Sequence, residues 1–82
     1  QPKFNIDYPI STSNGRDITI NIYDSENGEL INNFEYKING KGKTTIANKT
    51  ITINSKEYNL NNKIMIEFSK IGYKNKKIII NI

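Results

Sequence analysis

The C-terminal stretch, residues 63–82, constrains the fold most strongly, because it has the pattern of two β-strands joined by a tight turn. It reads KIMIEFSKIGYKNKKIIINI, with isoleucine or phenylalanine at every second position on either side of Ile71-Gly72-Tyr73. A period of two places one set of side chains on a single face of a strand, where that set can be buried. The pattern therefore predicts a hairpin whose two strands turn their apolar faces towards the same core.

Shorter runs with the same alternation precede this hairpin. Between them, residues 24–28 and 39–42 carry the Asp, Asn and Gly that favour chain reversal, and no window has the apolar spacing of an amphipathic helix. The sequence predicts strands at residues 16–23, 34–38 and 50–54, with further extended pieces at residues 44–46 and around Tyr58 and Leu60. The expected fold class is all-β, an antiparallel β-sandwich of about seven short strands.

Residues 1–15 differ from the rest of the chain in composition. They contain both prolines and a Ser/Thr/Asn/Gly cluster, which is typical of a linker or a loosely attached edge segment. Within them, Phe4, Ile6 and Tyr8 alternate in a way that suits a short strand. We therefore expect residues 1–15 to be a linker or edge segment and residues 16–82 to be the β-sandwich domain.

The apolar runs are too short for a membrane span. None approaches the roughly 20 residues that such a span needs, so membrane insertion is not expected. The chain reads as a module of a longer protein, and the isolated domain is expected to be monomeric.

The side-chain inventory excludes most catalytic chemistry. The 82 residues include no Cys and no His, which removes the commonest metal ligands and nucleophile–base pairs. The Asp and Glu residues have no partner at a spacing that suits acid–base catalysis. Asp24, Glu26 and Asn27 share one turn but lack the spacing of a calcium-binding loop. We expect neither enzymatic activity nor a cofactor or metal.

The net charge of +4 raises the question of a nucleic-acid partner. The lysines are spread along the chain with acidic residues between them, and only residues 74–77 form a basic cluster. Such a distribution is typical of a solvated surface and of edge strands protected by lysine. Nucleic acid is therefore the less favoured partner. A small basic β-barrel that binds single-stranded nucleic acid through Lys and Tyr stays an alternative.

Two stretches together resemble a known family. ITINIYDSENGELINNFEYKINGKGKTT, followed by KIMIEFSKIGYKNKKIII, is similar to the carboxypeptidase regulatory-like and collagen-adhesin B-type (prealbumin-like) domains of bacterial surface and secreted proteins. In these domains the first strand ends in an Asp and a Gly-containing turn, here Asp24 and Gly28. The last hairpin carries a Gly-Tyr pair followed by Lys or Thr, here Gly72-Tyr73-Lys74. The resemblance implies a prealbumin-like, Ig-like sandwich in an extracellular or cell-surface protein.

The resemblance covers residues 16–82 and departs from the family pattern between residues 44 and 62. Some adhesin domains of this kind form an intramolecular Lys–Asn isopeptide bond with the help of a buried acid. Here the position that would hold the lysine is Ile22, which has no amine. Asn81 and Glu67 oppose the apolar positions of their strands and should face water. We therefore expect no isopeptide bond.

Two functional classes remain. The favoured one is a non-catalytic accessory or stalk module that spaces or docks neighbouring domains of a larger bacterial surface or secreted protein, with an adhesive variant that contacts carbohydrate or protein. The other is the nucleic-acid-binding barrel. The side chains best suited to contact a ligand are aromatic or basic residues on strands and turns: Tyr23, Tyr36, Tyr73, Lys74, Lys76 and Lys77.

Overall fold

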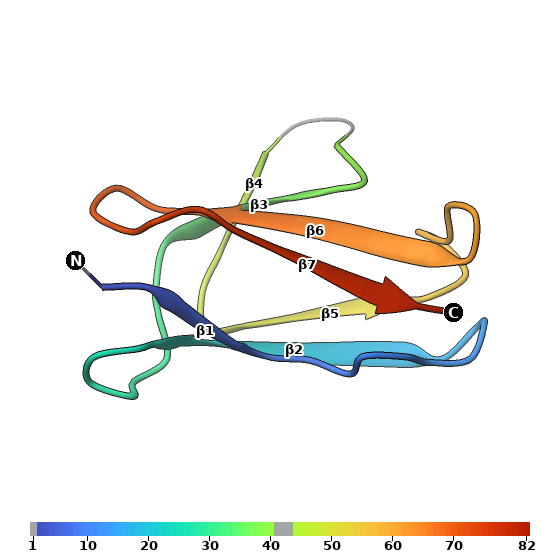
Figure 1. The fold of residues 1–82 in the computed structure, drawn as a ribbon, viewed down its shortest axis with the longest axis horizontal. Coiled ribbons are helices and arrows are strands. Elements are labelled where there is room, and N and C mark those ends of the chain that lie inside the picture. The colour runs from blue at the N-terminus through green and yellow to red at the C-terminus, as the bar shows by residue number, and fades with distance from the viewer. Residues whose placement is uncertain (1, 41–43) are drawn as a thin grey trace.

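The structure is a computed structural model that describes residues 2–40 and 44–82. In these residues the chain forms seven strands, arranged as two antiparallel sheets that pack face to face (Figure 1). The strands are β1 (Phe4–Asp7), β2 (Asp17–Asp24), β3 (Phe34–Ile38), β4 (Thr45–Ala47), β5 (Thr50–Asn54), β6 (Lys63–Ser69) and β7 (Lys76–Asn81). One sheet has the order β1-β2-β5 and the other β4-β3-β6-β7. The predicted all-β sandwich of about seven strands is confirmed.

The alternation of apolar residues decides which face of each strand is buried. In β2 the isoleucines Ile18, Ile20 and Ile22 are buried, whereas the residues between them are exposed or half-buried. Full burial of such a side chain stabilises the fold by roughly 1.5–3 kcal/mol. The core between the sheets consists of Phe4, Ile18, Ile20, Ile22, Ile31, Phe34, Ile51, Ile53, Ile64, Ile66, Phe68, Ile78 and Ile80. Isoleucine faces therefore hold the two sheets together.

The C-terminal hairpin is present as predicted. Lys63 at the start of β6 lies opposite Asn81 at the end of β7, and Phe68 lies opposite Lys76. In the connecting loop Gly72 has a φ of 87°, a backbone conformation that a residue with a Cβ atom rarely adopts. Because β6 lies between β3 and β7 in the sheet order, the hairpin supplies a central strand of the larger sheet.

The other predicted strands are found close to their expected bounds, at β2, β3, β4 and β5. The predicted reversal at residues 39–42 begins with Asn39 and Gly40, which both have positive φ. Its second half, Lys41-Gly42, lies outside the described residues. Among the residues that are described, no helix is long and apolar enough to cross a membrane.

The extended segment predicted around Tyr58 and Leu60 is wrong. Residues 55–58 form a turn, and Leu60 makes only an isolated bridge. The cause is a side-chain hydrogen bond, in which Oδ1 of Asn54 accepts the backbone N–H of Lys56 at 3.0 Å. An Asx turn of this kind reverses the chain locally. This turn prevails over the extended conformation, which was predicted from an alternation of only two apolar residues.

The N-terminal segment lies along one side of both sheets. β1 pairs with β2 as an edge of the smaller sheet. The same segment is connected to the larger sheet by two isolated parallel bridges, one between Lys3 and Lys74 and one between Ser11 and Asn81. Figure 1 shows that β1 begins towards one end of the long axis of the molecule, which measures 34 Å, and that the C-terminus lies at the other end.

Candidate functional site

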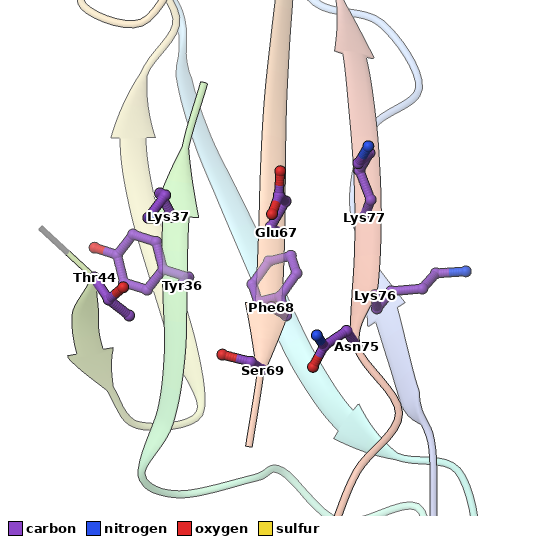
Figure 2. A pocket seen from close by; sticks show the side chains of 9 residues that line it. All are labelled: Tyr36, Lys37, Thr44, Glu67, Phe68, Ser69, Asn75, Lys76 and Lys77. Atoms are coloured by element: carbon purple, nitrogen blue, oxygen red, sulfur yellow. The ribbon is translucent and has the colours of Figure 1, made fainter. Parts of the chain in front are cut away.

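A row of three charged side chains crosses the outer face of the larger sheet. Lys37 on β3 lies opposite Glu67 on β6, and Glu67 lies opposite Lys77 on β7. The row faces outwards because Ile66 and Phe68, the neighbours of Glu67 along β6, are buried in the core. Opposite charges on adjacent strands stabilise the pairing by roughly 0.2–1 kcal/mol. The sheet register therefore places Glu67 between two lysines on neighbouring strands (Figure 2).

This row borders an open hollow of about 370 Å³, here called the sheet hollow. Thr44 and Asn75 add a hydroxyl and an amide group that can donate and accept hydrogen bonds, and the Ser69 hydroxyl donates to Oε2 of Glu35 at 3.5 Å. The side chains come from β3, β6, β7, the β6–β7 loop and the residue before β4 (Figure 2). The lining residues are Tyr36, Lys37, Thr44, Glu67, Phe68, Ser69, Asn75, Lys76 and Lys77.

The sheet hollow has a surplus of positive charge, since three lysines and a single carboxylate line it. Lys37 and Lys77 lie beside Glu67, whereas Lys76 lies opposite Phe68 and its side chain points away from Glu67 (Figure 2). Lys76 and Lys77 are exposed, and Lys37 is half-buried. A lysine ammonium is a compact point charge that can bind a carboxylate or phosphate without demanding a fixed geometry. Because these charges face water, each contact is weak and is screened by salt. The arrangement suits reversible binding of an acidic group.

Tyr36 offers only part of its ring to the sheet hollow. The side chain is half-buried and packs against the core. Its ring centroid lies 6.3 Å from that of Phe34, at an interplanar angle of 44°. A ligand that stacks on aromatic faces would therefore find a partly covered surface here.

The structure brings three of the predicted contact residues together, because Tyr36, Lys76 and Lys77 all line the sheet hollow. Lys74 lies just before β7 and borders an adjacent hollow whose other lining residues are Lys3, Phe4, Asn75 and Lys76. Tyr23 lies on β2, in the smaller sheet. The predicted aromatic residues are thus distributed over separate parts of the molecule and do not form one platform.

Tyr73, the remaining predicted contact residue, is engaged inside the protein. Its hydroxyl donates a hydrogen bond to Oδ2 of Asp24, and its ring stacks on Phe4 with centroids 5.1 Å apart. Oδ1 of Asp24 accepts the backbone N–H of Glu26 at 2.7 Å and that of Asn27 at 3.3 Å. The hydrogen bond from Tyr73 holds the pKa of Asp24 below its usual value, and the same bond raises the pKa of Tyr73.

Asp24 therefore acts as a local hydrogen-bond acceptor that orders the β2–β3 turn, which is the usual role of an aspartate in an Asx turn. In residues 2–40 and 44–82, no group of three or more His, Cys, Asp or Glu side chains is placed to hold a metal ion. At the positions considered for an isopeptide bond, Ile22 is buried, whereas Glu67 and Asn81 are exposed as their alternation predicts.

Sequence reasoning missed six lining residues of the sheet hollow: Lys37, Thr44, Glu67, Phe68, Ser69 and Asn75. The exposed position of Glu67 was evident from alternation, but its neighbours were not, because they come from strands far apart in the sequence. The sequence signal that could have found them is opposite charge at outward-facing positions of different strands. This signal identifies a site only when the strand order is known, because the order decides which strands are neighbours.

Comparison with known proteins gives no match to this chain, whether with family models, with curated proteins or with solved structures. The function of the chain is therefore inferred from the sandwich itself, chiefly from the sheet hollow and from the positions of the chain ends.

Proposed function

We propose that this chain is a non-catalytic accessory or stalk module that spaces or docks neighbouring domains of a larger bacterial surface or secreted protein. The observation that carries the proposal is the position of the chain ends. Lys3 is bridged to Lys74, beside the β6–β7 loop. At the other end of the sandwich, the Ile82 N–H donates to the Asn62 C=O in the β5–β6 turn at 2.9 Å.

A module with its ends so placed holds its neighbours apart along one axis. The long axis of 34 Å sets the spacing that one such module contributes. The packed isoleucine core supports this proposal, because a close-packed interior resists bending of one sheet against the other. Glu67, Lys76 and Lys77 are exposed, which favours a binding or spacing role over catalysis, because catalytic groups are commonly desolvated.

The prealbumin-like family and the bacterial cell-surface or extracellular location are part of the same proposal. They rest on the resemblance of the Asp24 turn and of Gly72-Tyr73-Lys74 to those domains. The partners proposed on this basis are the neighbouring domains of the parent chain.

The spacing function can be tested with a rigid reporter domain fused to each end of the chain and one spin label in each reporter. Dipolar EPR then measures the distribution of distances between the two labels. We expect a single narrow distribution centred beyond the length of the sandwich. A fusion in which a Gly/Ser linker of equal length replaces the chain is the control, and it should give a broad distribution. A broad distribution for the chain itself, or reporters lying side by side, would rule out the spacer.

The sheet hollow favours a second function, that of an adhesive module. We infer that the hollow is a contact surface for a carbohydrate or protein that carries acidic groups. The supporting observation is that Lys37 and Lys77 lie in one row on the outer face of the larger sheet, next to the polar groups of Ser69 and Asn75. Ammonium groups would bind the acid, and hydroxyl and amide groups would bind neighbouring polar atoms of the ligand.

An amide NMR titration tests the adhesive function with three probes: a uronic-acid oligosaccharide, a neutral oligosaccharide of equal length, and a short single-stranded oligonucleotide. We expect the acidic sugar alone to shift the amides of Lys37 and Lys77, with smaller shifts at high salt. Lys77→Gln should weaken these shifts, whereas Lys56→Gln, an exposed lysine in the β5–β6 turn, should not. Shifts with the oligonucleotide alone would favour the nucleic-acid alternative. A spectrum that none of the three probes changes would contradict the adhesive function and leave only the spacer function.

A further inference from the structure

The two terminal segments of the chain run parallel to each other along one side of the sandwich. Lys3 is bridged to Lys74 and Ser11 to Asn81, both in parallel orientation. β1 begins at the end of the molecule where β7 also begins, and the chain leaves β7 at the opposite end (Figure 1). A pull on the two chain ends would therefore draw these parallel segments past each other along their length.

We infer that the sandwich is built to carry tension along its long axis, through a clamp formed by the N-terminal segment, residues 3–12, and β7. This inference rests on the proposed spacer function, because only a module joined to neighbours at both ends is stretched between them. Under such a pull β1 slides along β2, over the register from Phe4 to Asp7. In the same way β7 slides along β6, over the register from Lys76 to Asn81. Each ladder is loaded along the strand direction.

The direction of the pull relative to the strands decides how large a force a backbone hydrogen-bond ladder can resist. In a ladder sheared along its strands, all the hydrogen bonds share the load and must fail nearly together. In a ladder opened from one end, the load falls on one bond after another, so each fails at a much smaller force. Backbone ladders of equal length can therefore differ several-fold in the force that they resist.

The start of the clamp is anchored by two hydrogen bonds between Lys3 and Ser25 and by an aromatic side chain. The Lys3 N–H donates to Oγ of Ser25 at 3.0 Å, and the Ser25 N–H donates to the Lys3 C=O at 2.9 Å. The next residue, Phe4, is only 6% exposed. Its ring stacks on Tyr73 and lies 6.1 Å from the ring of Phe68. Sliding of β1 therefore has to draw an aromatic ring out of the core, a step that resists displacement beyond the loss of hydrogen bonds.

The other end of the clamp is anchored by three hydrogen bonds near the C-terminal end of β7. The Asn81 N–H donates to the Ile10 C=O at 2.9 Å, and the Thr12 N–H donates to the Asn81 C=O at 2.8 Å. The next residue, Ile82, donates to Asn62 at 2.9 Å. Asn81 is hydrogen-bonded through its N–H to Ile10 and through its C=O to Thr12, and both partners belong to the N-terminal segment. A pull that draws β7 out of the sandwich therefore has to break these bonds to the segment that is pulled in the opposite direction.

Single-molecule force spectroscopy on the full chain in two pulling geometries tests the clamp. In the first geometry the handles are attached to the N- and C-terminal ends. In the second they are attached to Lys63→Cys and to the C-terminal end, which opens the β6–β7 ladder from one side, because Lys63 lies opposite Asn81. We expect the first geometry to need a several-fold larger unfolding force. An end-to-end force equal to or below that of the second geometry would overturn the clamp.

A matched pair of variants separates the clamp from overall stability. Phe4→Ala removes a buried side chain of the loaded strand β1, and Ile53→Ala removes one of β5, which carries neither chain end; each side chain is 6% exposed. We expect only Phe4→Ala to lower the end-to-end unfolding force markedly, although both should lower the free energy of unfolding. Equal losses of force would show that the force reports global stability, which would contradict the clamp.

The failure of the clamp and the failure of the spacer can be told apart. A low end-to-end force combined with a narrow distance distribution between fused reporters would leave a spacer that bears no load. A broad distance distribution would remove the spacer, whatever force the sandwich resists.

Discussion

Substitution of Phe4 measures how much the N-terminal segment contributes to the stability of the sandwich. We expect Phe4→Ala to lower the free energy of unfolding strongly. The side chain is 6% exposed, and its ring lies 5.1 Å from the ring of Tyr73 and 6.1 Å from that of Phe68. Truncation of a buried Phe to Ala typically costs about 3–5 kcal/mol. Because β1 is an edge strand that can relax into the vacated space, we expect a loss near the lower limit, about 3 kcal/mol.

The assay is urea unfolding followed by circular dichroism, with a thermal scan beside it. A chain of this length has a free energy of unfolding of roughly 4–12 kcal/mol, at about 0.05–0.15 kcal/mol per residue. A loss of about 3 kcal/mol would therefore lower the thermal midpoint by roughly 12–24 °C, at about 4–8 °C per kcal/mol for a domain of this size.

The control is Ile10→Ala, a change in the same segment at a side chain that is 74% exposed. It should alter the free energy of unfolding by no more than about 0.5 kcal/mol. If Phe4→Ala cost less than about 1 kcal/mol, the core would close without β1. Residues 1–15 would then be a loosely attached linker, and the argument from the burial of Phe4 would be refuted.

Three further predictions concern single contacts. The pKa of Asp24 is lowered and that of Tyr73 is raised, so their hydrogen bond should stabilise the fold fully only between about pH 4 and pH 10. The stabilisation should be lost as the pH falls through the lowered pKa of Asp24 and as it rises through the raised pKa of Tyr73. Urea unfolding across this range should show the difference between wild type and Tyr73→Phe shrinking at both extremes, and a constant difference would contradict the assignment. Gly72→Ala has open space around the new Cβ but keeps a φ of 87°, so its unfolding midpoint in urea should report a loss of about 1–2 kcal/mol; no loss would mean that the loop relaxes. Ser55→Ala removes the donor to the Ser13 C=O at 2.8 Å and should cost about 1–3 kcal/mol in the same assay, and a neutral result would show that water replaces the hydroxyl.

Most of the fold could be predicted from alternation alone, because each strand has one buried face and a side-chain period of two. The prediction was best where isoleucines repeat, as in Ile18, Ile20 and Ile22 of β2. It failed around Tyr58, where the side chain of Asn54 forms an Asx turn. A local hydrogen bond of this kind leaves no periodic pattern, so an alternation of two residues is a weak guide.

The candidate site was less predictable, because it depends on the strand order. Lys37, Glu67 and Lys77 form one row only because β3 and β7 lie on either side of β6. Alternation gives the outward direction of such side chains, but it does not say which strands are neighbours. Pairing is a property of the whole sheet, and a one-residue change of register would move each side chain to the other face.

The contact between Asp24 and Tyr73 changes the interpretation of two separate sequence signals. Asp24 stood out as the end of a strand and Tyr73 as a candidate ligand contact, yet they are 49 residues apart and share a hydrogen bond. With its hydroxyl donated to Asp24 and its ring stacked on Phe4, Tyr73 joins the β2–β3 turn, the β6–β7 loop and the N-terminal strand. A tyrosine used in this way has little left to offer a ligand. Of the predicted contact residues, the exposed lysines Lys76 and Lys77 are therefore better placed than Tyr73 to meet the ligand that we propose. Tyr73 instead belongs with the contacts that hold one end of the sandwich together.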